Sequence, residues 1–358
     1  MTYEGARSII GPYLSLLGAS GAVVGLIVGL GEFIGYGMRL LSGYATDRFR
    51  HYWGITFLGY AINLCAVPLL AWADHWQTAA ALIVLERFGK AIRVPSRDAM
   101  LSYATHQTGR GWGFGLHEAL DQIGAVIGPL FIMLSLFWGE SYRWGFAFLA
   151  FPAAASLITL TLARLSFPCP QSMEISVQKW EGLSRNYWIY VVAVGLVSCG
   201  FANFALISFH FQKASAVAPM WIAGLYALAM AIAGGSALIM GRWFDRQGLS
   251  VLAWTTGLSS LFAPLVFWGE GYAIGLGMIL WGIGVGSQES IMRAAVAHFS
   301  SSEKRGRAYG ILNFAIGLGW GIGSFAIGAL YDLGIAYAVA FSLLVQWAAI
   351  PLLLSLKK

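Results

Sequence analysis

Twelve apolar segments, each long enough to cross a lipid bilayer, constrain the fold of this chain more than any other feature. A helix rises about 1.5 Å per residue, so about 20 apolar residues span a hydrocarbon core of about 30 Å. The segments are residues 2–19, 21–45, 53–73, 76–100, 112–138, 144–165, 187–211, 217–241, 250–268, 272–297, 308–332 and 335–355. They are continuously apolar rather than alternating, so they favour helices over a transmembrane barrel. We therefore expect an all-α polytopic membrane protein.

The composition agrees with this class. Only 11% of the residues are charged and the mean hydropathy is +0.69, whereas soluble domains carry about 25% charged residues. The net charge of +6 is not gathered in a nucleic-acid-binding motif. Glu4 and Arg7 lie within the first segment, so we expect no cleavable signal peptide and a first helix that lacks its opening turns.

One long polar connection, residues 166–186, divides the segments into six and six. The halves also resemble each other: residues 110–130 align with 305–325 at a constant offset of 195, which superposes several glycines. We therefore expect two pseudo-symmetric six-helix bundles, residues 1–165 and 187–358, on either side of a central loop. Paired repeats of this kind are typical of transporters whose binding site lies between the halves.

The bases predict the orientation in the membrane. One set of connections carries thirteen lysines and arginines, and the opposite set carries only Arg143 and Lys213. The first set comprises Arg48, Arg50, Arg110, Arg164, Lys179, Arg185, Arg242, Arg246, Lys304, Arg305, Arg307, Lys357 and Lys358. Because positively charged loops stay inside, we expect a cell-membrane protein with its central loop and C-terminus in the cytoplasm.

Two turns carry a family resemblance. The turn after the second segment reads GYATDR and holds Gly43, Asp47 and Arg48, and the turn after the eighth reads GRWFDR and holds Gly241, Asp245 and Arg246. Both resemble the signature of the major facilitator superfamily. The resemblance implies a twelve-helix fold with these residues as a gating latch, in which glycine permits close helix contact and the charges pair at the membrane surface.

The fifth segment resembles the corresponding helix of the proton-driven exporters of that superfamily. It carries Gly115, Gly124, Gly128 and Pro129 at the matching spacing, although Ile132 stands where the last glycine of the pattern is expected. Arg87, two residues before Gly89, resembles a further motif of the fourth helix that is tied to proton transfer. The glycines have two interpretations: close packing alone, or packing combined with a gating hinge.

Ionisable residues inside the segments are candidates for function, because charge in hydrocarbon needs a partner or a cavity. The spacing places Glu86, Lys90, Arg93 and Arg97 on one face of the fourth helix. Glu118 and Asp121 of the fifth helix have two interpretations: static pairing with Lys90 and Arg93, or titration as proton carriers. Proton-coupling candidates are Glu32, Glu118, Asp121, Arg87, Lys90 and Arg93. Substrate-binding candidates are Arg7, Glu86, Arg87, Asn203, His210 and Gln288.

These features predict a secondary active transporter that exports a small organic or amphipathic compound in exchange for protons. Two alternatives stay open: import of a polar or anionic metabolite by proton symport or facilitated diffusion, and a transporter-like sensor that does not cycle. We expect no enzymatic activity, no cofactor and no metal site, since the chain lacks a P-loop and clustered metal ligands. The expected partners are a small-molecule substrate, protons and the lipid bilayer, with no nucleic acid, and the expected state is a monomer.

Overall fold

The structure, a computed structural model, describes residues 1–49, 51–104, 110–138, 141–167, 183–299 and 305–356. These residues form fifteen α-helices and one short 3₁₀-helix, without a strand. The first half contains α1 (Thr2–Leu16), α2 (Gly21–Phe49), α3 (Tyr52–Leu69), η1 (Leu70–Trp72), α4 (Trp76–Ala104), α5 (Arg110–Phe137), α6 (Tyr142–Phe148) and α7 (Ala150–Ser166). The second contains α8 (Arg185–Gly200), α9 (Phe204–Lys213), α10 (Pro219–Gln247), α11 (Ser250–Ser260), α12 (Phe262–Phe267), α13 (Tyr272–Phe299), α14 (Arg305–Leu333) and α15 (Ile335–Ser355).

Each of the twelve expected segments is helical; three of them consist of two consecutive α-helices, and a fourth, residues 53–73, consists of α3 followed by η1. Within the described residues, nine helical segments are long and apolar enough to cross a membrane. The other three expected spans are α1, which has 15 residues, α4, which carries six charged residues, and α13, whose second half holds Gln288, Glu289 and Arg293. The all-α architecture predicted from the apolar segments is therefore confirmed.

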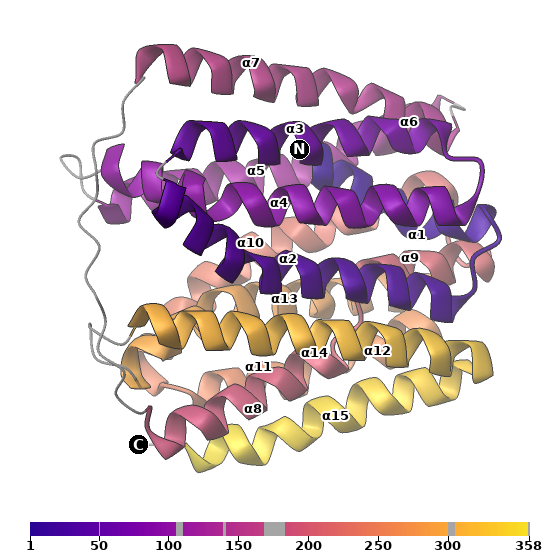
Figure 1. The fold of residues 1–358 in the computed structure, drawn as a ribbon. Helices are drawn as coiled ribbons and strands as arrows, with labels where there is room; N and C mark the ends of the chain where they lie inside the picture. The colour runs from indigo at the N-terminus through magenta and orange to yellow at the C-terminus, as the bar shows by residue number, and fades with distance from the viewer. Residues whose placement is uncertain (50, 105–109, 139–140, 168–182, 300–304, 357–358) are drawn as a thin grey trace.

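The helices lie side by side along one direction (Figure 1), with successive spans antiparallel. We call the end of the bundle at which α7 ends and α8 begins the linker end, and the opposite end the far end. Each span of odd number runs from the linker end to the far end. In Figure 1, α3, α4 and α7 lie on one side of the molecule, and α8, α14 and α15 on the other.

The seventh span is interrupted between α8 and α9, where Phe201 is extended and Asn203 begins the new helix by accepting a hydrogen bond from the Ala205 N–H. A break inside a membrane leaves backbone carbonyls without helical partners, which costs several kcal/mol unless other groups bind them. Side chains of the second half donate hydrogen bonds to these carbonyls. Trp281 donates to the Ala202 carbonyl at 3.0 Å, and Gln346 and Ser342 donate to the Gly200 carbonyl at 3.1 and 2.6 Å.

The two halves of the chain pack closely toward the far end. α2 lies against α14, α1 against α9, and α5 against α10. Small residues make the first of these contacts possible, since a Cβ atom added to Gly21 or Gly29 would come within 2.9 and 2.5 Å of backbone oxygens of α14. This is the close backbone approach that glycine permits between membrane helices.

Asp332, near the end of α14, joins the halves at the far end. Its carboxylate accepts hydrogen bonds from the first two N–H groups of α2, at 2.9 Å from Gly21 and 2.7 Å from Ala22. The Lys213 ammonium at the end of α9 lies 3.9 Å from the same carboxylate. A carboxylate at a helix N-terminus satisfies unpaired donors and interacts favourably with the helix dipole.

We predict that Asp332→Ala lowers the free energy of unfolding by about 1 kcal/mol, the usual cost of losing a side-chain acceptor at a helix N-terminus. Asp74→Ala is the matched control, because the Asp74–Arg143 pair lies at the same end with side chains 69% and 50% exposed. Denaturation midpoints of the purified variants measure both. Equal midpoints for the two variants would contradict the assigned role of Asp332.

Candidate functional site

Two arginines share one carboxylate in the middle of the first half. Glu32 of α2 lies 3.2 Å from the Arg7 guanidinium of α1 and 3.5 Å from that of Arg87 on α4. Glu32 and Arg87 are both buried. The absence of a side chain at Gly31 makes room for Arg87, whose Cγ lies 3.0 Å from the position that a Cβ would take. These contacts bring charges of α1, α2 and α4 together, and both bases that pair with Glu32 come from other helices.

The same cluster continues into α3. The Arg87 Nε lies 3.2 Å from the Glu86 carboxylate, which accepts a hydrogen bond of 2.7 Å from the side-chain amide of Asn63. Asn63 is fully buried and also donates to the Glu86 backbone carbonyl at 3.0 Å. Glu86 is therefore held by one charged and one neutral partner.

On α1 the cluster reaches the second half of the chain. The Glu4 carboxylate lies 3.9 Å from the Arg7 guanidinium and accepts a hydrogen bond from the hydroxyl of Tyr226 on α10. Tyr226 is fully buried, with its ring 4.4 Å from that of Phe204. We call Glu4, Arg7, Glu32, Asn63, Glu86, Arg87 and Tyr226 the central network.

Three further bases lie against tyrosine rings instead of carboxylates. Lys90 Nζ is 4.0 Å from the centre of the Tyr3 ring, Arg93 is 4.3 Å from that of Tyr60, and Arg39 is 4.6 Å from that of Tyr36. Among the described residues no carboxylate lies within 4.0 Å of these three bases. Cation–π contacts of this kind stabilise by about 0.5–2 kcal/mol.

The first interpretation, static pairing of Lys90 and Arg93 with Asp121, is therefore wrong. Asp121 is exposed, and its carboxylate accepts a hydrogen bond of 3.3 Å from the Tyr3 hydroxyl. The ring of Tyr3 occupies the place where an ion pair between α4 and α5 was expected. The side chain of Glu118 lies outside what the structure describes. Arg97 pairs with its neighbour Asp98 at 2.7 Å.

The expected site residues of the second half lie apart from the central network. Asn203 caps α9. His210 lies toward the far end, where its ring nitrogen is 3.0 Å from the Tyr331 hydroxyl and its ring packs against Phe267. Gln288 is half-buried on α13.

The glycines of the fifth helix pack within the first half. Gly124 and Gly128 of α5 face the beginning of α1, where a Cβ added to Gly128 would come within 2.9 Å of the Gly5 nitrogen. Pro129 is buried next to them. This contact holds the residues of α1 that carry Glu4 close to α5.

The residues of the expected gating latch lie near the linker end. A Cβ atom added to Gly43 of α2 would lie 3.8 Å from the Pro95 side chain of α4. One added to Gly241 of α10 would lie 3.0 Å from the Ser290 hydroxyl of α13. Arg48, Asp245 and Arg246 are exposed, while the side chain of Asp47 lies outside the described part of the chain. The role of these residues as a latch stays a prediction.

Four residues of the site are not among the residues expected from the sequence: Tyr3, Glu4, Asn63 and Tyr226. Polar residues in apolar segments are the only signal that points to Glu4 and Asn63. Tyrosines are common in membrane helices, so Tyr3 and Tyr226 carry no such signal before the helices are assembled.

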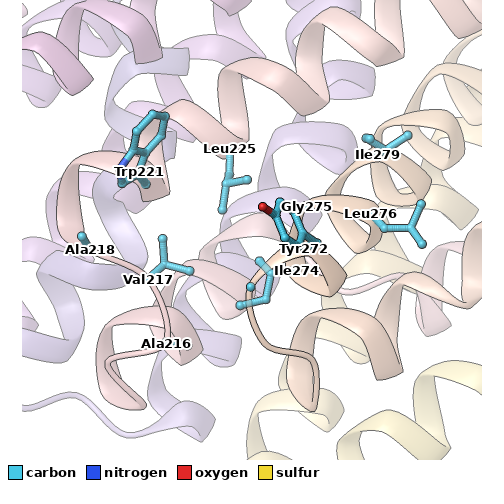
Figure 2. A pocket seen from close by; sticks show the side chains of 11 residues that line it. Ala216, Val217, Ala218, Trp221, Leu225, Tyr272, Ile274, Gly275, Leu276 and Ile279 are labelled. Atoms are coloured by element: carbon cyan, nitrogen blue, oxygen red, sulfur yellow. The ribbon is translucent and has the colours of Figure 1, made fainter.

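A separate cavity of about 580 Å³ lies at the far end of the second half. Trp221 and Leu225 of α10 lie on one side of it, and Ile274 near the start of α13 lies on the other (Figure 2). Its lining contains no ionisable group apart from the hydroxyl of Tyr272. It contains none of the expected site residues.

Comparisons with known proteins match this architecture. The chain is 37% identical over its whole length to the uncharacterized protein Rv2265 of Mycobacterium tuberculosis, of which it covers 90%. It is 23% identical to the multidrug resistance protein MdtH of Photorhabdus laumondii, over 90% of this chain and 81% of that protein.

Solved structures agree at the level of the fold. A mutant of the nucleoside transporter NupG superposes with a TM-score of 0.80 at 15% identity, covering 99% of this chain and 95% of that one. A bacterial homologue of the iron transporter ferroportin gives 0.77 at 12% identity, with coverages of 99% and 95%. Residues 1–324 match the description of one family, the Major Facilitator Superfamily. The chain belongs to this family of membrane transporters.

Proposed function

We propose that this protein is a secondary active transporter that exports a small organic compound in exchange for protons. The observation that supports proton coupling is the charge balance of the central network. Three carboxylates, Glu4, Glu32 and Glu86, lie within 4.0 Å of only two guanidinium groups, those of Arg7 and Arg87. A buried charge without a close partner is costly, so the surplus carboxyl is the natural place for a proton.

Glu4 is the carboxyl that best fits this role. Its distance to Arg7 is 3.9 Å, whereas Glu32 and Glu86 each have a guanidinium nitrogen at 3.2 Å. Glu4 is also only 6% exposed. The charged and titratable groups that act on it are the Met1 amino group, Tyr3 and Arg7 on the side of α1, Arg87 and Lys90 on α4, and Tyr226 on α10.

Protonation of Glu4 would change the relation between the two halves. The hydrogen bond from the Tyr226 hydroxyl to the Glu4 carboxylate crosses from α10 to α1. A proton on Glu4 would weaken this hydrogen bond, because an ionised acceptor binds a donor more strongly than a neutral one does, and it would also weaken the attraction of Arg7. Since a ligand shifts an equilibrium only through its different affinity for two states, proton binding would favour the state in which Glu4 and Tyr226 are apart.

Export as the direction rests on two resemblances. The fifth helix carries the glycine pattern that resembles the proton-driven exporters, and one relative is a multidrug resistance protein. The positive-inside rule places the linker end in the cytoplasm. Substrate would then enter from the linker end and leave at the far end.

Glu4→Gln is predicted to abolish proton-driven transport while leaving exchange of substrate across the membrane intact, because the amide keeps the shape of the site but cannot release a proton. Everted membrane vesicles with an acid interior measure this through the loss of their pH gradient when a transported compound is added. Asp74→Asn is the matched control, since that carboxylate is exposed at the far end.

The same assay tests the direction. An exporter releases protons from everted vesicles when its substrate is added outside, while a proton symporter does not. Proton release by Glu4→Gln at the level of Asp74→Asn would exclude Glu4 as the proton carrier. Substrate uptake without any proton release by the unmodified protein would favour the symport alternative.

Glu32→Ala is predicted to act on stability. It leaves two guanidinium groups, those of Arg7 and Arg87, without their shared carboxylate, and breaking a buried pair in this way costs about 3–5 kcal/mol. Asp98→Ala, which breaks the partly exposed pair with Arg97, should cost about 1 kcal/mol or less. Thermal unfolding of both variants measures the difference, and a smaller loss for Glu32→Ala than for Asp98→Ala would refute the shared pairing.

A further inference from the structure

Tyr3 of α1 holds an acid and a base apart in the space next to the central network. The Lys90 ammonium lies over the face of its ring at 4.0 Å, and its hydroxyl donates to the Asp121 carboxylate at 3.3 Å. The three residues come from α1, α4 and α5. Opposite charges on the two sides of one ring would normally form an ion pair, so their separation by that ring requires an explanation.

The positive side of this arrangement contains a second base. Arg93 follows Lys90 by three residues, which places both on one face of α4. Arg93 is 5% exposed, and its Nε is enclosed without a hydrogen-bond partner. In the part of the chain that the structure describes, neither base has a carboxylate within 4.0 Å, and each meets only a tyrosine ring. A buried guanidinium with an unused donor is a site for an anionic group.

The negative side is the Asp121 carboxylate. It is exposed, and the hydrogen bond from Tyr3 is the one polar contact recorded for it among the described residues. Its acceptor capacity is therefore mostly unused, since a carboxylate accepts about four hydrogen bonds. A cationic group that reached Asp121 from the linker end would satisfy it.

We propose that Lys90, Arg93, Tyr3 and Asp121 form the substrate site, and that the substrate is a zwitterion. Its anionic group binds between Lys90 and Arg93, its cationic group binds at Asp121, and its apolar body lies along the ring of Tyr3. This inference rests on the proposed transport function and adds the chemical class of the substrate. A plain anion would leave Asp121 unsatisfied, and a plain cation would leave Lys90 and Arg93 unsatisfied.

The test uses four aromatic probes of similar size that differ in charge: 4-(aminomethyl)benzoate, benzoate, benzylamine and benzyl alcohol. Their binding to the purified full chain is measured through tryptophan fluorescence and thermal stability. The zwitterion should bind at least about tenfold more tightly than each of the other three, because it alone makes charge-assisted hydrogen bonds at both ends of the site.

Variants assign the two ends of the probe. Lys90→Gln should remove the preference for the zwitterion over benzylamine, and Asp121→Asn should remove its preference over benzoate. Arg143→Gln, an exposed position at the far end, should keep both preferences. Equal binding of all four probes, or unchanged preferences in Lys90→Gln and Asp121→Asn, would overturn the proposal.

The Glu4→Gln variant separates this inference from the proposed function. It should retain the preference for the zwitterion, because Glu4 carries the proton and is not one of the four binding residues. If Glu4→Gln remained proton-driven while the charge preference held, the proton carrier would be wrong and the substrate site would stand. If the unmodified protein showed no preference for the zwitterion, the proposed substrate site would be wrong, and the proposed proton carrier would be unaffected.

Discussion

Two arginines share one carboxylate, that of Glu32, in the interior of this membrane protein. The other charged groups of the site are arranged around this contact. Charge at that depth is tolerated only when it is paired, hydrogen-bonded or open to water. Pairing Arg7 and Arg87 through Glu32 ties α1, α2 and α4 together. Neighbouring groups bind the charges that this pairing leaves without a second partner. Asn63 donates a hydrogen bond to Glu86, Tyr226 donates one to Glu4, and tyrosine rings lie against Lys90 and Arg93.

Contacts between the two halves of the chain are of two kinds. Toward the far end they are close and backbone-based, with glycines of α2 against α14 and the Asp332 carboxylate on the first turn of α2. In the interior, the hydroxyl of Tyr226 binds the Glu4 carboxylate. A transporter that alternates between two open states must break the first kind completely. A single proton on Glu4 can bias the change between the two open states, because it acts on a hydrogen bond that joins the halves.

Much of the fold, and less of the site, could be predicted from the sequence. The length of the apolar runs predicts each helical span, and the charges of the fourth span predict a buried ionic cluster. The partners within that cluster could not be predicted, because helical spacing places residues on a face of one helix but does not say which helix lies opposite. Lys90 and Arg93 illustrate this: their spacing suggested acids on α5, while the ring of Tyr3 lies between Lys90 and Asp121. The role proposed for Glu4 could be recognised only from the structure, in which α10 lies next to it.

Protonation of Glu4 is the event that we propose shifts the balance between the two states of the transporter. Spin labels at Leu16 and Leu333, both exposed at the far end, report the separation of the halves there in a variant without the three native cysteines. Acidification should populate longer distances when Glu4 is present, and it should leave the distances unchanged in Glu4→Gln. The same response to pH in both proteins would contradict the account.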